Sequence, residues 1–308
     1  MLGRRCQCCY KNTIRFGRQI SGMTSIITHR GLDPERPNYF FESSKEAFLD
    51  QLERGYGLEF DPQMTANGEI IVLHDSSLKR ISKGKDERFV KDITVEELLA
   101  LNLNGCRLMT LRELISTIQT KSDKNSISAM HLKHNFQGNL KNLDLLLCEL
   151  EMIDPEKYII FDVTLKTAKY LKKKNPSLHL APSVSHPYDI KRYNMATGGT
   201  LFTVEQVLAN KDLFDWVWLD EWDLSDKNGK TKKLYTKEVF DIFRESKIKI
   251  ALVTPELHGT SPGLLGGEAH PDAQNKETLH KRFMEITALH PDAMCSDYPD
   301  VLKKIIKM

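Results

Sequence analysis

The sequence contains no apolar run close to the roughly 18 consecutive residues that a membrane-spanning helix needs. It also lacks a strong charge of either sign, because 44 basic and 42 acidic side chains leave a formal net charge of +2. No global field therefore favours nucleic acid or an anionic membrane. We expect no transmembrane segment and no nucleic-acid partner.

Cysteine is scarce, and six residues scattered over 308 are too few for a disulfide framework. Cys6, Cys8 and Cys9 form a cluster. A zinc site needs a second pair of ligands, and no second C-x-x-C or H-x3-H follows. Reduced thiols in a cytoplasmic protein are therefore the default expectation.

The first 24 residues carry basic side chains but no acid, since the first acidic residue is Asp33. They also lack the apolar core of a secretory signal. Such a start is compatible with an organelle transit peptide, and equally with a disordered or vector-derived tail. We treat residues 1–24 as a basic tail or targeting segment, and 25–308 as one domain.

Short β-branched runs alternate with longer amphipathic stretches from residue 25 onward, which indicates a parallel sheet with crossover helices. Eight strands close a barrel, so the pattern predicts a single-domain (β/α)8 TIM barrel. The expected strands are 25–31, 57–61, 126–133, 158–163, 178–184, 216–221, 249–254 and 293–297.

Helices are expected between these strands, where apolar residues recur at spacings of three and four. A capping box is expected at Thr94. Residues 70–74 are also strand-like but follow a turn signal, so we interpret them as a hairpin arm rather than a ninth barrel strand. The expected helices are 45–54, 94–101, 111–120, 140–151, 165–174, 236–246, 276–289 and 300–307.

Polar side chains gather at the carboxyl ends of the first three strands, where the active sites of such barrels lie. They are His29 and Arg30 after the first strand, Glu59 and Asp61 on the second, His74 in the loop after it, and His131 and Lys133 on the third.

The spacing of Glu59 and Asp61 predicts a metal site. Residues i and i+2 of a strand point to the same face, so both carboxylates can reach one hard cation. They could instead be surface acids on an edge strand. Two inward acids without a partner would be costly, which favours the ligand role.

The two histidines suit phosphodiester cleavage. One of His29 and His74 can accept a proton from the nucleophile while the other donates one to the leaving alkoxide. A cation, Arg30 and Lys133 would neutralise charge that grows on the non-bridging oxygens.

The ordered set of motifs resembles the glycerophosphodiester phosphodiesterases. That family has H-R-G, E-x-D, T-x-D-G, V-x-H-D and L-x-R in this order. This chain has H-R-G at 29–31, E-F-D at 59–61, T-A-N-G at 65–68, V-L-H-D at 72–75 and L-K-R at 78–80. The likeness is strong over residues 26–118 and returns near the end as C-S-D-Y-P at 295–299.

The resemblance implies a TIM barrel, a divalent cation (magnesium or calcium) and hydrolysis of a glycerophosphodiester to an alcohol and a glycerol phosphate. It implies an acid/base role for His29 and His74, and phosphate contact by Arg30. It makes Glu59 and Asp61 metal ligands. Glu42 keeps the spacing of an eroded P-E-N-T-x-x-A-F motif, with Glu35 as the competing candidate.

The chain departs from the family at two strand ends. The third strand has His131-Leu132-Lys133 where the family has E-x-K. Imidazole suits manganese, iron or zinc better than calcium, so His131 as a metal ligand makes these cations alternatives. At the seventh strand, V-T-P-E at 253–256 replaces a W-T-V-N-like run that helps to shape the substrate pocket.

The expected substrate is a small glycerophosphodiester or a lysophospholipid, and the expected setting is phospholipid metabolism. The alternative is a lysophospholipase D or a sphingomyelinase-D-like enzyme, because these enzymes share the pattern of two histidines and an E-x-D motif. A third hypothesis is a non-catalytic binding protein, in which the loss of the acid on the third strand abolished metal binding. The sequence does not define the head group, the metal or the oligomeric state.

Overall fold

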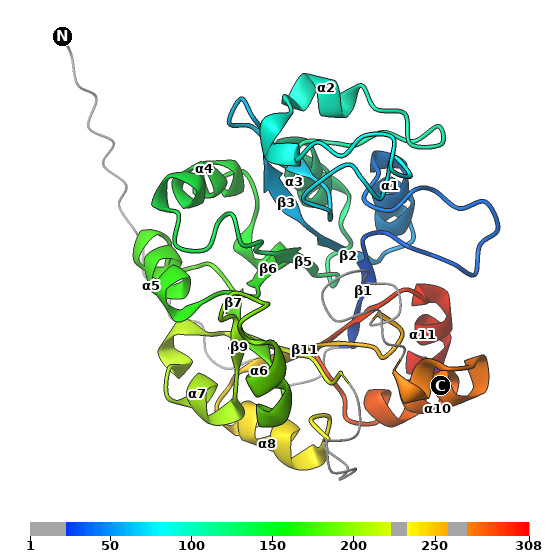
Figure 1. Cartoon of the computed structure of the whole chain (residues 1–308). Coiled ribbons are helices and arrows are strands. Elements are labelled where there is room, and N and C mark those ends of the chain that lie inside the picture. The colour runs from blue at the N-terminus through cyan, green and yellow to red at the C-terminus, as the bar shows by residue number, and fades with distance from the viewer. Residues whose placement is uncertain (1–22, 223–232, 258–269, 308) are drawn as a thin grey trace.

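The computed structural model describes residues 23–222, 233–257 and 270–307. In Figure 1 the strands occupy the centre and the helices form a ring around them. The strands follow the order β7-β6-β5-β2-β1-β12-β11-β10-β8-β9, and every neighbouring pair in this sheet is parallel. Most of the 1–24 segment, including the cysteine cluster, lies outside the described residues.

Each expected barrel strand is present. The strands are β1 (Ser25–His29), β2 (Gly57–Phe60), β5 (Ser128–His131), β6 (Tyr158–Phe161), β7 (Leu180–Ala181), β8 (Ser183–Val184), β10 (Trp216–Leu219), β11 (Lys249–Val253) and β12 (Ala293–Ser296). Among the described strands, the short β9 (Leu201–Phe202) pairs only with β8 and stands at the end of the strand order.

The barrel closes through one interrupted strand. β7 pairs with β6 on one side, whereas β8 pairs with β10 on the other. Only Pro182 separates β7 from β8, and its carbonyl accepts a hydrogen bond from Trp218 N at 3.0 Å. Proline cannot donate to a ladder, so it marks the point where the strand changes partners. The expected (β/α)8 barrel is confirmed.

The expected helices are also confirmed. They are α1 (Lys45–Glu53), α2 (Val95–Leu99), α3 (Leu111–Lys121), α4 (Leu140–Leu150), α5 (Leu165–Lys174), α8 (Lys237–Glu245), α10 (Lys276–Thr287) and α11 (Pro299–Ile306). Two short helices were not expected, namely α6 (Pro187–Tyr193) and α7 (Val204–Leu208). No helix within the described ranges combines the length and apolarity needed to cross a membrane.

The segment after β2 forms the expected hairpin. β3 (Pro62–Met64) and β4 (Ile70–Val72) pair antiparallel outside the barrel sheet. α2 packs beside this hairpin, and the expected capping box of Thr94 and Glu97 is present. Apolar side chains of these elements form a cluster of their own under the loop.

Side-chain alternation along the strands divides the core in two. Ile26 belongs to the large cluster beneath the helices, whereas Ile27 belongs to the cluster inside the barrel. Because the period of a strand is two, His29 shares the inward face with Ile27. Likewise Leu58 and Phe60 pack outward, so Glu59 between them points inward. The fold thus turns polar residues at strand ends toward the barrel axis.

Candidate active site

The sheet register places His29 between two acids. Thr28 pairs with Ser296 of β12, so His29 and Asp297, which follow them, are neighbours. On its other side His29 pairs with Glu59 of β2. His29 Nδ1 lies 2.9 Å from Asp297 Oδ1, and the buried carboxylate accepts this hydrogen bond. The contact fixes the imidazole and leaves Nε2 available for proton transfer.

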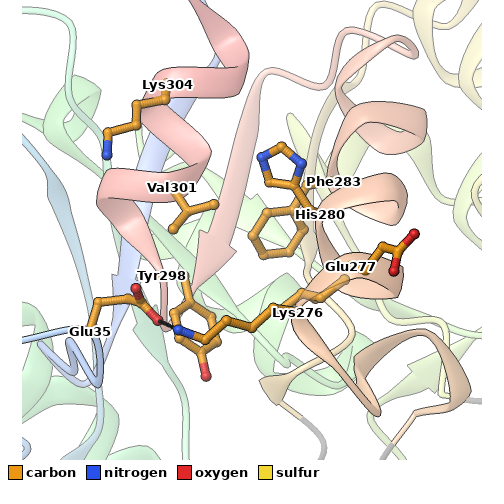
Figure 2. Close-up of a pocket in the computed structure, with 9 residues that line it drawn as sticks. Glu35, Lys276, Glu277, His280, Phe283, Tyr298, Val301 and Lys304 are labelled. Atoms are coloured by element: carbon orange, nitrogen blue, oxygen red, sulfur yellow. Dashed lines mark hydrogen bonds and ion pairs between the residues drawn. The ribbon is translucent and has the colours of Figure 1, made fainter.

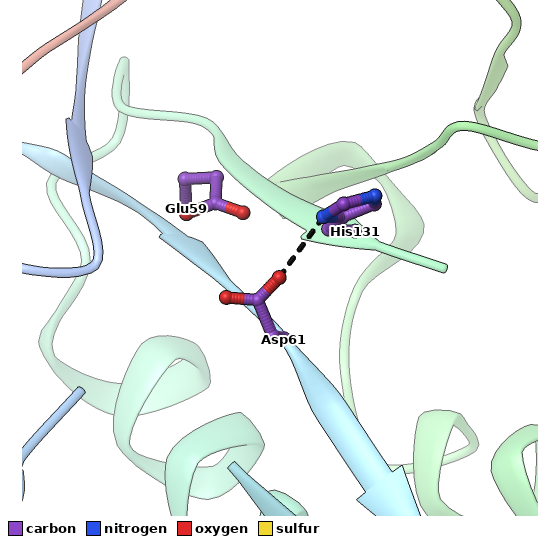
Figure 3. A group of neighbouring side chains, drawn as sticks. All are labelled: Glu59, Asp61 and His131. Carbon is purple, nitrogen blue, oxygen red and sulfur yellow. Dashed lines mark hydrogen bonds and ion pairs between the residues drawn. The ribbon is translucent and has the colours of Figure 1, made fainter. Parts of the chain in front are cut away.

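Glu59, Asp61 and His131 form one compact group (Figure 3). One ligand atom from each lies within 4.8 Å of the others. Glu59 is 3% exposed and Asp61 is fully buried. The carboxylates come from β2 and its end, and the imidazole from the end of the adjacent β5.

The group fits a divalent cation. Glu59 Oε2 and Asp61 Oδ2 are buried and have no hydrogen-bond partner within the part of the chain that the structure describes. Such oxygens are costly unless a cation or a donor reaches them. Ligand atoms about 2.0–2.4 Å from one ion lie at most roughly 4–5 Å apart, and the atoms of this group stay within that limit. The three residues would therefore be the ones that hold a metal.

The ionisation of the two acids differs. Burial raises the pKa of the Glu59 carboxyl, and the adjacent Asp61 raises it further. Burial also opposes ionisation of Asp61, but the Lys133 ammonium, His74 and His131 outweigh it. They hold the pKa of Asp61 well below its usual range. Lys133 Nζ lies 2.8 Å from Asp61 Oδ1, so this lysine balances the acidic group directly.

His131 is held at both ring nitrogens. Its Nδ1 lies 2.9 Å from Asp61 Oδ1, and its Nε2 lies 3.2 Å from Asp162 Oδ2. Burial and Lys133 oppose the charged ring, but the hydrogen bonds to Asp162 and Asp61 outweigh them and raise the pKa of His131. A metal would have to displace the proton between His131 and Asp61.

The hairpin carries His74 to the same rim. Leu73 N donates to Asp61 O at 2.9 Å, so the residue that follows it lies beside the acidic group. His74 Nδ1 lies 2.7 Å from Asp75 Oδ1. Burial, followed by the charge of Lys133, lowers the pKa of His74 to about 4. The ring is therefore neutral at pH 7, as a proton acceptor must be.

A chain of ion pairs connects Arg30 to His74. Arg30 Nη1 donates to Glu42 Oε2 at 3.2 Å, and the other oxygen of Glu42 accepts from Arg80. Arg80 Nε in turn donates to Asp75 Oδ2 at 2.6 Å. The structure thus brings Glu42 to the guanidinium of Arg30.

Glu35, the competing candidate, lies elsewhere. Figure 2 shows it at a separate groove between α10 and α11, of about 440 Å³. Its Oε1 lies 2.8 Å from Lys276 Nζ. Phe283 and Tyr298 line the same groove, and none of its lining residues belongs to the acidic group.

The structure adds residues to the site beyond those that the sequence predicts. Asp75, Arg80 and Asp297 stand in the motifs at 72–75, 78–80 and 295–299, so their motif positions were the available signal. Glu256 and Asp162 have no such signal. Glu256 stands in the V-T-P-E run that departs from the family pattern, and Asp162 is an isolated acid at the end of β6.

Comparisons with solved structures show the same architecture. A glycerophosphodiester phosphodiesterase from Thermotoga maritima superimposes with a TM-score of 0.58 at 18% identity, over 94% of this chain and 100% of that one. A phosphodiesterase from Oleispira antarctica, solved with the product sn-glycerol-3-phosphate, gives a TM-score of 0.61 at 14% identity. That superposition covers 93% of this chain and 98% of the other. At such identities these likenesses support the fold alone.

Sequence comparison supports the family. A glycerophosphodiester phosphodiesterase from Caldanaerobacter subterraneus is 36% identical over 107 residues. The aligned stretch covers 32% of this chain and 42% of that relative, so less than half of the relative's length is matched. The model of the glycerophosphoryl diester phosphodiesterase family matches residues 29–243, which include every sequence-predicted site residue. Because this model matches more than half of the chain, the chain belongs to the glycerophosphoryl diester phosphodiesterase family.

Proposed function

We propose that the protein is a metal-dependent phosphodiesterase that hydrolyses a glycerophosphodiester to an alcohol and a glycerol phosphate. The observation that carries this proposal is the pair of buried carboxylates beside His131, because Glu59 Oε2 and Asp61 Oδ2 have no hydrogen-bond partner among the described residues. Two further histidines, each anchored at Nδ1 by a carboxylate, flank this pair along the rim.

His29 and His74 are the proposed acid/base pair. Asp297 and Asp75 hold their Nδ1 atoms, so each ring presents Nε2 to the substrate. Hydrolysis needs one proton taken from water and one delivered to the leaving alkoxide oxygen, which two such rings supply. The neutral state of His74 at pH 7 suits the step that accepts a proton.

Arg30 and Lys133 are the proposed phosphate-binding cations. Both contact the acidic group, Arg30 Nε at 3.9 Å from Asp61 Oδ2 and Lys133 Nζ at 2.8 Å from Asp61 Oδ1. From there they would neutralise the charge on the non-bridging oxygens of a phosphodiester bound beside Glu59. When bound, a divalent cation supplies further Lewis-acid stabilisation of the charge that develops there.

The substrate class follows from the family and from its relatives. The relative from Oleispira antarctica was solved with sn-glycerol-3-phosphate, one of the two products proposed here. A small molecule with one phosphodiester and a glycerol moiety is the substrate we propose, with a role in phospholipid breakdown.

The direct test is purified protein with glycerophosphocholine, assayed with magnesium, calcium or manganese and with a chelator. We expect choline and glycerol phosphate to appear with metal and to disappear with the chelator. Phosphorus NMR would identify the phosphate product. Unchanged hydrolysis in the chelator would contradict the metal dependence. Metal binding without turnover of this diester or of lysophosphatidylcholine would favour the binding-protein reading.

If Glu59 and Asp61 hold the cation, their substitution should abolish metal binding. Glu59→Gln and Asp61→Asn should each abolish the rise in melting temperature that the cation produces. In the wild type, a metal at a hundred times its Kd should add about 2.7 kcal/mol to the free energy of unfolding. Glu256→Gln is a matched control, because Glu256 is also a buried acid at this end of the barrel. If both acid variants keep the full thermal shift, the metal binds elsewhere.

If His131 is a metal ligand, its imidazole should determine which cation the site prefers. Its nitrogen favours manganese, iron or zinc, whereas a carboxylate favours calcium and magnesium. His131→Glu should therefore strengthen magnesium and calcium binding relative to manganese, as isothermal titration would show. Identical metal profiles in the variant and the wild type would make His131 a bystander.

A further inference from the structure

We propose that Asp162 is a positioning residue that holds His131 with its Nδ1 toward Glu59 and Asp61, so that this histidine–aspartate pair replaces the strand-3 glutamate of the family. The proposal deepens the proposed function and rests on the metal site described above. It concerns a residue that no motif contains.

Asp162 Oδ2 lies 3.2 Å from His131 Nε2, on the far side of the ring from Asp61. A carboxylate is a common acceptor for the second ring N–H of a metal-binding histidine. Once a metal displaces the Nδ1 proton, the Asp162 contact keeps the remaining proton on Nε2 and leaves the lone pair on Nδ1. That lone pair then faces the cation site beside the two buried carboxylates. A histidine ligand whose second nitrogen donates to a carboxylate is both oriented and a stronger donor to metal.

The carboxylate of Asp162 is stabilised in its ionised form. Burial opposes ionisation, but His131 and, to a smaller extent, the Thr200 and Ser183 side chains outweigh it and lower the pKa of Asp162. The backbone is fixed, because Asp162 N donates to Ala181 O at 3.1 Å and Gln137 Nε2 donates to Asp162 O at 2.6 Å.

Asp162 adopts a φ of +62°, in the left-handed region that non-glycine residues seldom occupy. Such strain persists only where the surroundings over-determine it, and it concentrates at functional sites. Here the conformation turns the side chain back across the barrel mouth toward β5, where His131 ends the strand.

Stacking fixes the plane of the histidine ring. His131 lies on Phe161, with ring centroids 4.8 Å apart and an interplanar angle of 17°. Phe161 stacks in turn on Trp218 at 4.0 Å. The stack prevents the ring from tilting, and Asp162 prevents it from turning within its plane. Together they leave one orientation, with Nδ1 at the acidic pair.

The test measures manganese and magnesium affinity of the full chain by isothermal titration. Asp162→Gly removes the carboxylate while keeping a residue at ease with positive φ. Asp162→Asn keeps an oxygen acceptor at a residue type that tolerates this conformation. We expect manganese affinity to fall 10–100-fold in Asp162→Gly and less in Asp162→Asn. We also expect the manganese preference over magnesium to fall.

Asp215→Ala is the control. Asp215 also faces a histidine, His179, at 3.6 Å, but it precedes β10 and lies at the opposite end of the barrel. Its replacement should leave both affinities unchanged. A second control is Asp162→Gly in a His131→Ala background, where a residue that acts through His131 should cause no further loss.

The outcomes separate the two claims. If the wild type binds neither cation, or if Glu59→Gln binds a cation as tightly as the wild type does, the proposed function fails and this inference fails with it. If the wild type binds metal and Asp162→Gly binds it equally tightly with the same preference, only the inference is overturned. A full additional loss in the His131→Ala background would likewise show that Asp162 does not act through His131.

Discussion

Alanine in place of His29, or in place of His74, should lower kcat by roughly two to four powers of ten. Each ring is anchored at Nδ1 by a carboxylate and presents Nε2 to the rim, so its removal deletes one proton transfer. Neither ring belongs to an apolar core cluster. The melting temperature of the metal-free protein should therefore change far less than the rate. Steady-state kinetics with glycerophosphocholine, together with thermal unfolding, would measure both.

His280→Ala is a suitable control, because His280 is exposed on α10 and lines the separate groove. It should retain wild-type kcat and KM. Activity within a few-fold of wild type in either the His29 or the His74 variant would rule out the proposed acid/base pair. The unfolding curves would show whether a variant is folded, and activities are compared only between folded variants.

The barrel could be predicted because its signal is local. Each strand is a short apolar run bounded by polar or turn residues, and each helix repeats its apolar residues every three or four positions. These patterns survive in one sequence without any knowledge of contacts. The closing strand illustrates the limit. Pro182 marks an interruption within residues 178–184, but the sequence does not indicate that the two halves pair with different strands, because strand pairing depends on the whole sheet.

The candidate site was predictable where chemistry and spacing coincide. Glu59 and Asp61 stand two residues apart in a strand, and the period of two places both on one face. His131 and Lys133 follow the same rule on the next strand. The structure adds that Lys133 pairs with Asp61, which no spacing could indicate.

Asp162 and Glu256 were not predictable as site residues, because their positions depend on tertiary contacts. Asp162 reaches His131 only through a left-handed backbone conformation. Glu42 prevailed over Glu35 as the partner of Arg30 for a related reason. Ser43, also at positive φ, donates its N–H to the Arg30 carbonyl at 2.8 Å, which places the preceding glutamate beside the guanidinium.

Glu256 follows β11 and binds the end of β12. Its Oε1 accepts from Thr254 Oγ1 at 2.7 Å, Ser296 Oγ at 2.6 Å and Asp297 N at 3.1 Å. It therefore fixes the residue that anchors His29. Burial raises the pKa of Glu256 from 4.5 to about 7, and the adjacent Asp297 carboxylate contributes. Burial raises the pKa of Cys295 and of Tyr298, and the charge of Glu256 in turn contributes to both shifts.

The raised pKa of Glu256 predicts that the folded protein loses stability as pH rises. Between pH 4.5 and 7 the folded state binds more protons at this carboxyl than the unfolded chain does, so the free energy of unfolding falls with pH. The contribution of the protonated Glu256 to the free energy of unfolding is fully present below pH 4.5. About 3 kcal/mol of it is lost above pH 7. Glu256→Gln cannot ionise, so urea unfolding of wild type and variant, both in chelator, should show this difference growing across that window. Glu277→Gln, an exposed site on α10, should follow the wild type. Parallel pH curves for wild type and Glu256→Gln would mean that Glu256 stays ionised in the folded protein.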